Sequence, residues 1–170
     1  MDGLSRHPDF GIEPFNSPVE VGLRALAVLT ASHPVAYGLQ RLTVLDYLVV
    51  HSDDLPDGPP GLHPPTPYRA GELLLRREVL EQGLLLYQSR GLLERRFEPD
   101  GVFYAATDAA ASFLDVFSSR YVEALRDRAA WVTGHFASVD DDRLFKQVDG
   151  WIGEWGAEFT QRVVLREESA

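Results

Sequence analysis

Apolar residues recur at helical spacing near the start of the chain, and polar residues mark where the first helix begins. Ser17 and Glu20 flank Pro18 in the arrangement of a capping box, which satisfies amide donors that a helix start leaves unpaired. The helix is predicted to run from Pro18 to about Ala31. It should end there because the residue before Pro34 disfavours helical backbone geometry.

Two further helices are predicted on either side of a proline-rich stretch. The second covers about 36–51, with apolar residues at helical spacing. Residues 52–68 contain six prolines and two glycines, which exclude a helix or a central strand. We interpret this stretch as an ordered surface loop rather than a flexible linker, because it retains apolar residues and proline-rich chain costs little entropy to order. A third helix is predicted at about 71–89, and Gly91 fits its C-terminal cap.

A β-hairpin is predicted directly after the third helix. Two short strands, 92–97 and 102–106, are predicted on either side of the sequence Glu98-Pro99-Asp100-Gly101. In that turn, proline fixes one backbone angle and glycine supplies a positive φ. Alternate residues of the first strand share one face, and these are Leu93, Arg95 and Phe97.

The remainder of the chain is predicted to be helical. Thr107-Asp108 is expected to cap the next helix, and a bend is expected at Ser118-Ser119. Ser138 or Asp140 is expected to cap a last helix, whose acidic first turn suits the helix dipole. Aromatic residues lie on its apolar face, including Trp151 and Trp155 one helical turn apart.

These elements predict a mainly α protein with a small β-hairpin, an α+β fold. Three helices followed by a hairpin are the order of a winged helix-turn-helix, in which the third helix and the hairpin form the recognition surface. We therefore expect a flexible segment at 1–16, a winged-helix-like domain at 17–107 that includes loop 52–68, and a C-terminal helical extension at 108–170 packed on it. Helix-plus-hairpin patterns also occur in unrelated α+β domains.

Composition and charge exclude several classes of function. Without cysteine, the chain can have neither a disulfide scaffold nor a thiol nucleophile. A net charge of −10 argues against a general binder of phosphate backbones. A leader sequence and a membrane-spanning apolar run are not apparent, so we expect a cytoplasmic protein without membrane contact.

Lys146 is the only lysine, and the other basic residues are arginines, which suit protein interfaces. Residues 69–96 carry six arginines against four glutamates. Three roles are open for these arginines. Pairing with neighbouring glutamates on a solvated surface is favoured, contact with another protein comes second, and contact with nucleic acid comes third. The protein-interface candidates are Arg76, Arg77, Arg95, Arg96, Trp151 and Trp155.

Asp46, His51 and His63 form a possible metal-ligand set, since two imidazoles and a carboxylate are a common combination. Asp46 and His51 are five residues apart and lie on poorly matched faces of a helix. We therefore favour a structural role for all three in bracing the loop. Nucleophile, phosphate-loop and metalloprotease motifs are missing from the sequence, so we expect neither catalysis nor a cofactor.

An ordered series of short motifs over roughly residues 20–133 resembles the middle component of bacterial ABC-three-component conflict systems. The series comprises Arg24-Ala25-Leu26-x-x-Leu29, His33-Pro34, Leu39-Gln40-Arg41-Leu42-x-x-Leu45-Asp46-Tyr47-Leu48-x-x-His51-Ser52, Gly58-Pro59, Leu62-His63, Pro67-x-Arg69-x-Gly71-Glu72, Arg76-Arg77, Glu81-x-Gly83-Leu84, Gly101-Val102-x-Tyr104-x-Ala106-Thr107, Tyr121 and Arg128-Ala129-x-Trp131-Val132.

The resemblance implies a non-enzymatic subunit of an antiphage defence complex. Such systems, including Lamassu-type ones, combine an SMC/Rad50-like ABC ATPase, a small middle component similar to winged-helix proteins, and a toxic effector, often a nuclease. The middle component would sit on the ATPase or between the ATPase and the effector, with indirect or weak DNA contact. A DNA-binding winged-helix regulator is the alternative.

Overall fold

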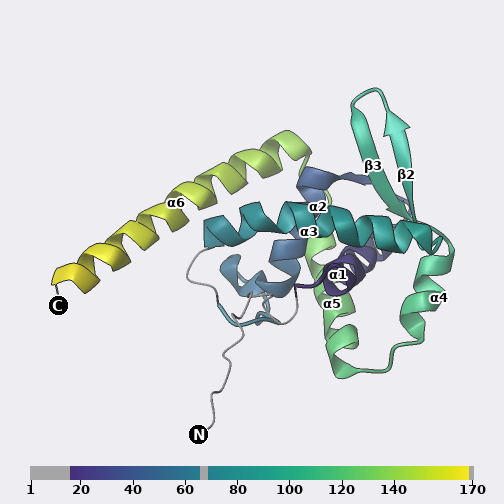
Figure 1. The fold of residues 1–170 in the computed structure, drawn as a ribbon, viewed down its shortest axis with the longest axis horizontal. Helices are drawn as coiled ribbons and strands as arrows, with labels where there is room; N and C mark the ends of the chain where they lie inside the picture. The colour runs from purple at the N-terminus through teal and green to yellow at the C-terminus, as the bar shows by residue number, and fades with distance from the viewer. Residues whose placement is uncertain (1–15, 66–68, 169–170) are drawn as a thin grey trace, which may run out of the picture.

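The computed structural model describes residues 16–65 and 69–168, with side chains described except at 70, 74 and 155–168. The expected segment 1–16 lies outside this description except for Asn16. The described chain is mainly helical with a small antiparallel sheet, which confirms the predicted fold class (Figure 1). The winged-helix assignment stays a prediction.

The first three helices follow the predicted pattern. Helix α1 (Pro18–Ala31) begins with the capping box at Ser17 and Glu20. Helix α2 (Leu39–Val50) starts later than predicted, because Tyr37–Gly38 forms strand β1 and pairs with the hairpin. Two residues are too short to give a periodic pattern. Helix α3 (Arg69–Ser89) is followed by Gly91 at φ +71°.

The hairpin forms as predicted. Strands β2 (Leu93–Glu98) and β3 (Gly101–Ala106) pair antiparallel, and the sheet order is β1-β3-β2. The register places Arg95 opposite Tyr104 and Phe97 opposite Val102. Figure 1 shows the hairpin projecting from the body beside the C-terminal end of α3.

The C-terminal helices are α4 (Ala109–Asp115), α5 (Arg120–His135) and α6 (Asp141–Glu168). The expected bend is a full break, and Ser119 caps α5 by accepting from the amide of Val122. The cap expected from Thr107-Asp108 is found in part. Asp108 is the N-cap residue of α4 but makes no side-chain cap hydrogen bond, and the Thr107 hydroxyl donates to the carbonyl of Gly91. Asp140 caps α6 by accepting from the amide of Arg143.

Helices α1 and α3 cross in close contact. A Cβ atom added to Gly83 would lie 2.7 Å from the backbone nitrogen of Gly22 and from the carbonyl oxygen of Pro18. Glycine is required at such a crossing because any side chain would push the helices apart. Tyr87 reinforces the contact by donating to the carbonyl of Val19 at 2.9 Å. The first helix and the third therefore form one tightly packed unit.

The core lies between α1, α2, α3 and α5, and leucines contribute much of it. The first part of α6 lies near α2 and α3, and Figure 1 shows the helix extending from there away from the body. Among the helices, none combines the length and apolar character needed to cross a membrane within the described residues.

Candidate functional site

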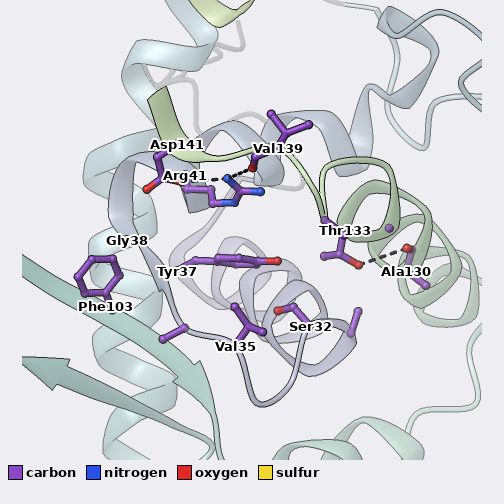
Figure 2. Close-up of a pocket in the computed structure, with 14 residues that line it drawn as sticks. Ser32, Val35, Tyr37, Gly38, Arg41, Phe103, Ala130, Thr133, Val139 and Asp141 are labelled. Atoms are coloured by element: carbon purple, nitrogen blue, oxygen red, sulfur yellow. Dashed lines mark hydrogen bonds and ion pairs between the residues drawn. The ribbon is translucent and has the colours of Figure 1, made fainter. Parts of the chain in front are cut away.

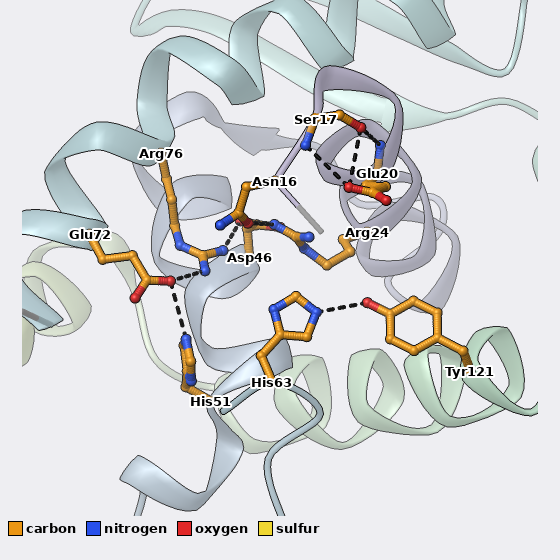
Figure 3. Close-up of polar contacts among 10 residues, drawn as sticks. All are labelled: Asn16, Ser17, Glu20, Arg24, Asp46, His51, His63, Glu72, Arg76 and Tyr121. Atoms are coloured by element: carbon orange, nitrogen blue, oxygen red, sulfur yellow. Dashed lines mark hydrogen bonds and ion pairs between the residues drawn. The ribbon is translucent and has the colours of Figure 1, made fainter. Parts of the chain in front are cut away.

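Asp46 lies at the centre of a buried network of charged side chains from three helices (Figure 3). Arg24 on α1 donates to it from Nε at 2.7 Å and from Nη2 at 3.1 Å. Arg76 on α3 donates from Nη1 at 2.5 Å. All three side chains are at most 4% exposed. Burial alone would raise the pKa of Asp46, but the two guanidinium groups bring it below its ordinary value, so the carboxylate stays ionised.

Glu72 extends the network toward the end of α2. Arg76 donates to the Glu72 carboxylate one helical turn away, and Nε2 of His51 lies 3.2 Å from Oε1 of the same carboxylate. Burial would raise the pKa of Glu72, but hydrogen bonds from His51 and Arg76 lower it to about 2. Since His51 is the C-cap of α2, this contact joins the end of α2 to the start of α3.

His63 folds back from the proline-rich loop toward the same network. Its Nε2 lies 2.9 Å from the hydroxyl oxygen of Tyr121 on α5, and the two rings stack with centroids 6.2 Å apart. The His51 and His63 rings meet edge-on at 6.3 Å. Burial, with the nearby charges of Arg24 and Arg76, lowers the pKa of His63 to about 4, so its imidazole is neutral at neutral pH.

The structure thus brings Asp46, His51 and His63 into one cluster, although two arginines already hold the Asp46 carboxylate. In the part of the chain that is described, no group of three or more His, Asp or Glu residues is arranged to hold a metal ion. The contacts of the cluster connect helices to one another and to the loop. Chemically, they position backbone segments and keep the buried charges balanced.

Further contacts fix the described part of the loop. The Ser52 hydroxyl donates to the carbonyl of Pro59 at 2.9 Å, and Arg128 on α5 donates from Nε to the carbonyl of Pro60 at 3.0 Å. A Cβ atom on Gly58 would lie 1.8 Å from the carbonyl oxygen of Ser52, so the chain turns too tightly there for any other residue. Residues 52–65 follow a defined path against α2 and α5.

The two interface candidates on α3 point in different directions. Arg76 is 4% exposed and belongs to the buried network, whereas Arg77 is exposed and pairs weakly with Glu81 at 3.8 Å. Consecutive residues on a helix are about 100° apart, so only one of the two can face the core. Arg76 therefore does not lie on an outer face of the folded chain.

The two interface candidates on the hairpin lie on opposite faces of β2, because side chains alternate along a strand. The Arg95 guanidinium lies 5.6 Å from the centre of the Phe97 ring. Arg96 pairs with Glu94 at 2.9 Å and donates to the carbonyl of Pro34. Of these two arginines, only Arg95 lies on the side of the hairpin that continues toward α3.

Of the two aromatic candidates on α6, the structure describes the side chain of Trp151 alone. Trp151 is half-buried and packs against the core. The side chain of Trp155 lies outside the described part of the chain. The apolar face of α6 thus begins as part of the core.

A groove lies between α3 and the hairpin, and we call it the α3–hairpin groove. Its volume is about 300 Å³. The residues that line it are Glu81, Gln82, Leu85, Gln88, Arg95 and Tyr104. Leu85, which lines the groove, is 62% exposed. Phe97 and Val102, one pair further along the hairpin on the face of Arg95 and Tyr104, are 75% and 40% exposed. Exposed apolar side chains gathered at a groove are typical of an interaction site.

A larger open pocket of about 560 Å³ lies where the end of α1, β1, α5 and the start of α6 meet. Arg41 closes one side by donating at 2.9 Å to the carbonyls of Val139 and Phe136 and to Asp141. Figure 2 shows the Tyr37 ring below this guanidinium, whose carbon lies 5.0 Å from the ring centre. Arg41 therefore joins α2 to the start of α6 and forms a fixed wall of the pocket.

Sequence reasoning missed Arg24, Glu72 and Arg41 as members of internal networks. A signal was present for Arg24 and Asp46, because each is the one charged residue of a largely apolar stretch, 21–31 for Arg24 and 42–50 for Asp46. Opposite charges in two apolar helices predict a buried pair, since an isolated charge cannot be buried cheaply. Which further charges complete the network depends on how the helices cross.

Comparison with known families gives one match. The model of the family described as "ABC-three component (ABC-3C) system Middle Component 2" matches residues 14–158. Neither the curated proteins nor the solved structures yield a significant match.

Proposed function

The chain belongs to the Middle Component 2 family of ABC-three-component systems, and from this premise we propose that it is a non-catalytic adaptor between the ABC ATPase and the effector. The family match confirms the resemblance carried by the motifs over residues 20–133. A middle component of a three-component system has partner components. The proposal has four finer parts. They are the adaptor role, the SMC/Rad50-like character of the ATPase, the nuclease character of the effector and a relation to Lamassu-type systems.

The exposed apolar side chains at the α3–hairpin groove carry this proposal. Leu85 and Phe97 are each more than half exposed, although burying such side chains is worth about 1.5–3 kcal/mol each. A partner that covers them would gain that energy. The buried network supports the non-catalytic part of the proposal, because the hydrogen bonds that Asp46 and Glu72 accept hold the helices together.

A DNA-binding winged-helix regulator is the second candidate, and the exposed Arg77 and Arg95 favour it. In that fold the third helix and the hairpin would face the DNA. On α3, however, the exposed surface includes Glu78, Glu81 and Leu85, which suit neither phosphates nor base edges, and Arg76 is buried. The protein-adaptor proposal therefore explains this face better.

Co-expression with the ATPase and effector components of the same system tests the proposal. We expect this chain to co-purify with each component, and the ATPase and effector to co-purify with each other less well when it is left out. A chain that stays monomeric and binds neither component would contradict the adaptor role. A sequence-specific gel shift with steep salt dependence, weakened in the double variant Arg77→Ala/Arg95→Ala, would establish the regulator instead.

A further inference from the structure

Strand β2 forms one edge of the described sheet, because the strand order is β1-β3-β2. The register between β2 and β3 is continuous from Leu93 to Glu98, without a bulge, and β2 contains no proline. Bulges and prolines are common ways in which proteins block pairing at a sheet edge. Charged side chains are a third way, and their signs decide whether a second strand is repelled.

The backbone groups that point to this open edge belong to Leu93, Arg95 and Phe97. The amide of Thr107 donates to the carbonyl of Leu92 at 3.1 Å, and the register of β2 and β3 continues from this pair. In an antiparallel ladder, every second residue bonds to the partner strand, and the residues between point their N–H and C=O groups away from it. Within the described chain, none of the three outward residues makes a backbone hydrogen bond to another element.

The charges along β2 match those of a second copy of the same strand. Two copies related by a two-fold axis pair antiparallel, and the outward residues of one strand must face the outward residues of the other. With Arg95 on the axis, Glu94 of each copy faces Arg96 of the other. In the same register, Leu93 of each copy faces Phe97 of the other. The pairing therefore joins two pairs of opposite charges and two pairs of apolar side chains.

The neighbouring registers suit the sequence less well. Registers centred on Glu94 or Arg96 place two like charges opposite each other in a non-hydrogen-bonded pair, where side chains lie closest. The register centred on Phe97 joins Arg96 to Glu98 but aligns only half of each strand. The register centred on Arg95 aligns nearly the whole strand, and its central like charges lie in the wider, hydrogen-bonded kind of pair.

This register also gives the exposed aromatic ring of the hairpin a place. Phe97 is 75% exposed, whereas Leu93 is 2% exposed at the base of the hairpin, beside the C-terminal end of α3 (Figure 1). The pairing carries the Phe97 ring of one copy to the apolar base of the other copy's hairpin. The two central Arg95 side chains each have an acidic neighbour, because Glu81 lines the α3–hairpin groove with Arg95.

We propose that two copies of this chain pair antiparallel through their β2 strands and form one continuous sheet across both copies. The added backbone hydrogen bonds come from Leu93, Arg95 and Phe97, and the crossed pairs of Glu94 and Arg96 fix the register. This pairing goes beyond the proposed adaptor function, because it needs no other component. It would give the complex two copies of each adaptor surface.

The first test exchanges the two charges and measures the oligomeric state by sedimentation over a range of protein concentrations. The unchanged chain is expected to dimerise. Glu94→Arg and Arg96→Glu should each weaken the dimer about tenfold, because each places like charges opposite each other twice. Thermal unfolding of both variants establishes that they fold.

An equimolar mixture of these two single variants provides the matched control. Each variant faces opposite charges in the other, so a heterodimer should form about as tightly as the unchanged dimer. Neither variant has an opposite-charge pair between residues 94 and 96 of its own strand, so the recovery cannot come from a contact within one copy. A mixture that stays monomeric while the unchanged chain dimerises would overturn the register.

The second test uses the absence of cysteine from the chain. Arg95→Cys places two thiols on the two-fold axis, where the Cα atoms of a hydrogen-bonded pair lie about 5.5 Å apart, within reach of a disulfide. Mild oxidation should therefore link the two copies. Glu98→Cys is the control, because its two thiols would be about 20 Å apart along the paired strands. Equal crosslinking of the two variants would contradict the pairing.

The outcomes separate this inference from the adaptor role. A chain that is monomeric at every concentration, or a dimer that both charge variants leave unchanged, makes the strand pairing wrong. If the amides of Leu93, Arg95 and Phe97 become protected from hydrogen exchange only when the ATPase or the effector is added, that component pairs with the edge and the second copy is the wrong partner. Co-expression tests the adaptor role independently of each of these results.

Discussion

Each face of α3 departs in part from the usual distribution of polar and apolar residues, because the inner face has charges among its buried leucines and the outer face has exposed leucines. The inner face carries Arg76 and Glu72 into the molecule, where Asp46 and His51 meet them. The outer face exposes Leu75 and Leu85. A helix that only had to fold would bury its leucines and expose its charges.

This difference shows that the two faces answer to different requirements. The inner charges are matched and hydrogen-bonded, so they fix one arrangement of α1, α2 and α3 among those that an apolar core would allow. The outer leucines are exposed and contribute little to the fold, and under the proposed adaptor function their burial would stabilise a complex with a partner. Changes to the inner face should therefore alter stability, and changes to the outer face should alter binding.

Removing the central carboxylate is expected to have the largest effect. Asp46→Ala leaves Arg24 and Arg76 buried without their shared partner, which should lower the free energy of unfolding by about 3–5 kcal/mol. Urea denaturation followed by circular dichroism measures the change. As a control, Arg77→Ala removes an exposed arginine next in sequence to Arg76 and should change stability by about 0.5 kcal/mol or less. Equal effects of the two variants would contradict the separation of the two faces.

Two adjacent leucines give the sharpest comparison of the faces. Leu84 is fully buried and Leu85 is 62% exposed. Leu84→Ala should destabilise the fold by about 2–5 kcal/mol because it leaves a cavity in the core. Leu85→Ala should change stability by about 0.5 kcal/mol or less and act on partner binding instead. Chemical denaturation of both variants measures this, and a large loss for Leu85→Ala would mean that its side chain serves the fold.

A pair of glycines tests how tightly the inner face is packed. Gly83→Ala adds a Cβ atom that would lie 2.7 Å from backbone atoms of α1, so the helices must separate at a cost of about 1–3 kcal/mol. Gly134 in α5 has no atom within 4 Å of the equivalent Cβ position. Gly134→Ala should therefore stabilise the protein by about 0.5–1 kcal/mol, because alanine favours the helix. Thermal unfolding should show opposite shifts for the two variants, and shifts of the same sign would contradict the close crossing.

Local signals in the sequence were sufficient for much of the fold. The capping box at Ser17 fixed the start of α1, and the turn at residues 98–101 fixed the hairpin, because both depend on neighbouring residues. Strand β1 was missed because its pairing partner, Tyr104, lies far away in sequence. The Thr107 cap failed because the hydroxyl found the carbonyl of Gly91 instead.

The candidate site was less predictable, because it depends on how helices cross. Asp46, His51 and His63 were identified by residue type, and the structure brings them together. Spacing along one helix does not give their partners on other helices, which are Arg24 and Arg76 for Asp46, Glu72 for His51 and Tyr121 for His63. Arg76 and Arg77 are adjacent residues of the same type, and the structure buries Arg76 and leaves Arg77 exposed. Periodicity could have separated them, since Arg76 is in phase with the buried Leu73, Leu80 and Leu84.

The smallest predicted effect is a pH dependence confined to the inner face. The pKa of His63 is about 4 in the folded chain against 6.5 for an unperturbed histidine, so the unfolded chain binds a proton first as pH falls. The stability that neutral His63 contributes is therefore fully present above pH 6.5 and is lost between pH 6.5 and 4. Because the side chain is half-buried, solvent screening limits the loss to about 1 kcal/mol.

Urea midpoints measured from pH 7 to pH 4.5 should show this loss, and His63→Gln should flatten it. Glu72 does not interfere over most of this range, since its pKa falls from 4.5 to about 2 on folding and its contribution is lost at lower pH. If partner binding is measured over the same range with folded protein, it should not follow the titration of His63, because the outer face of α3 does not include that side chain. A binding curve that does follow it would mean that the two faces are coupled, and that the loop held by His63 and Tyr121 takes part in recognition.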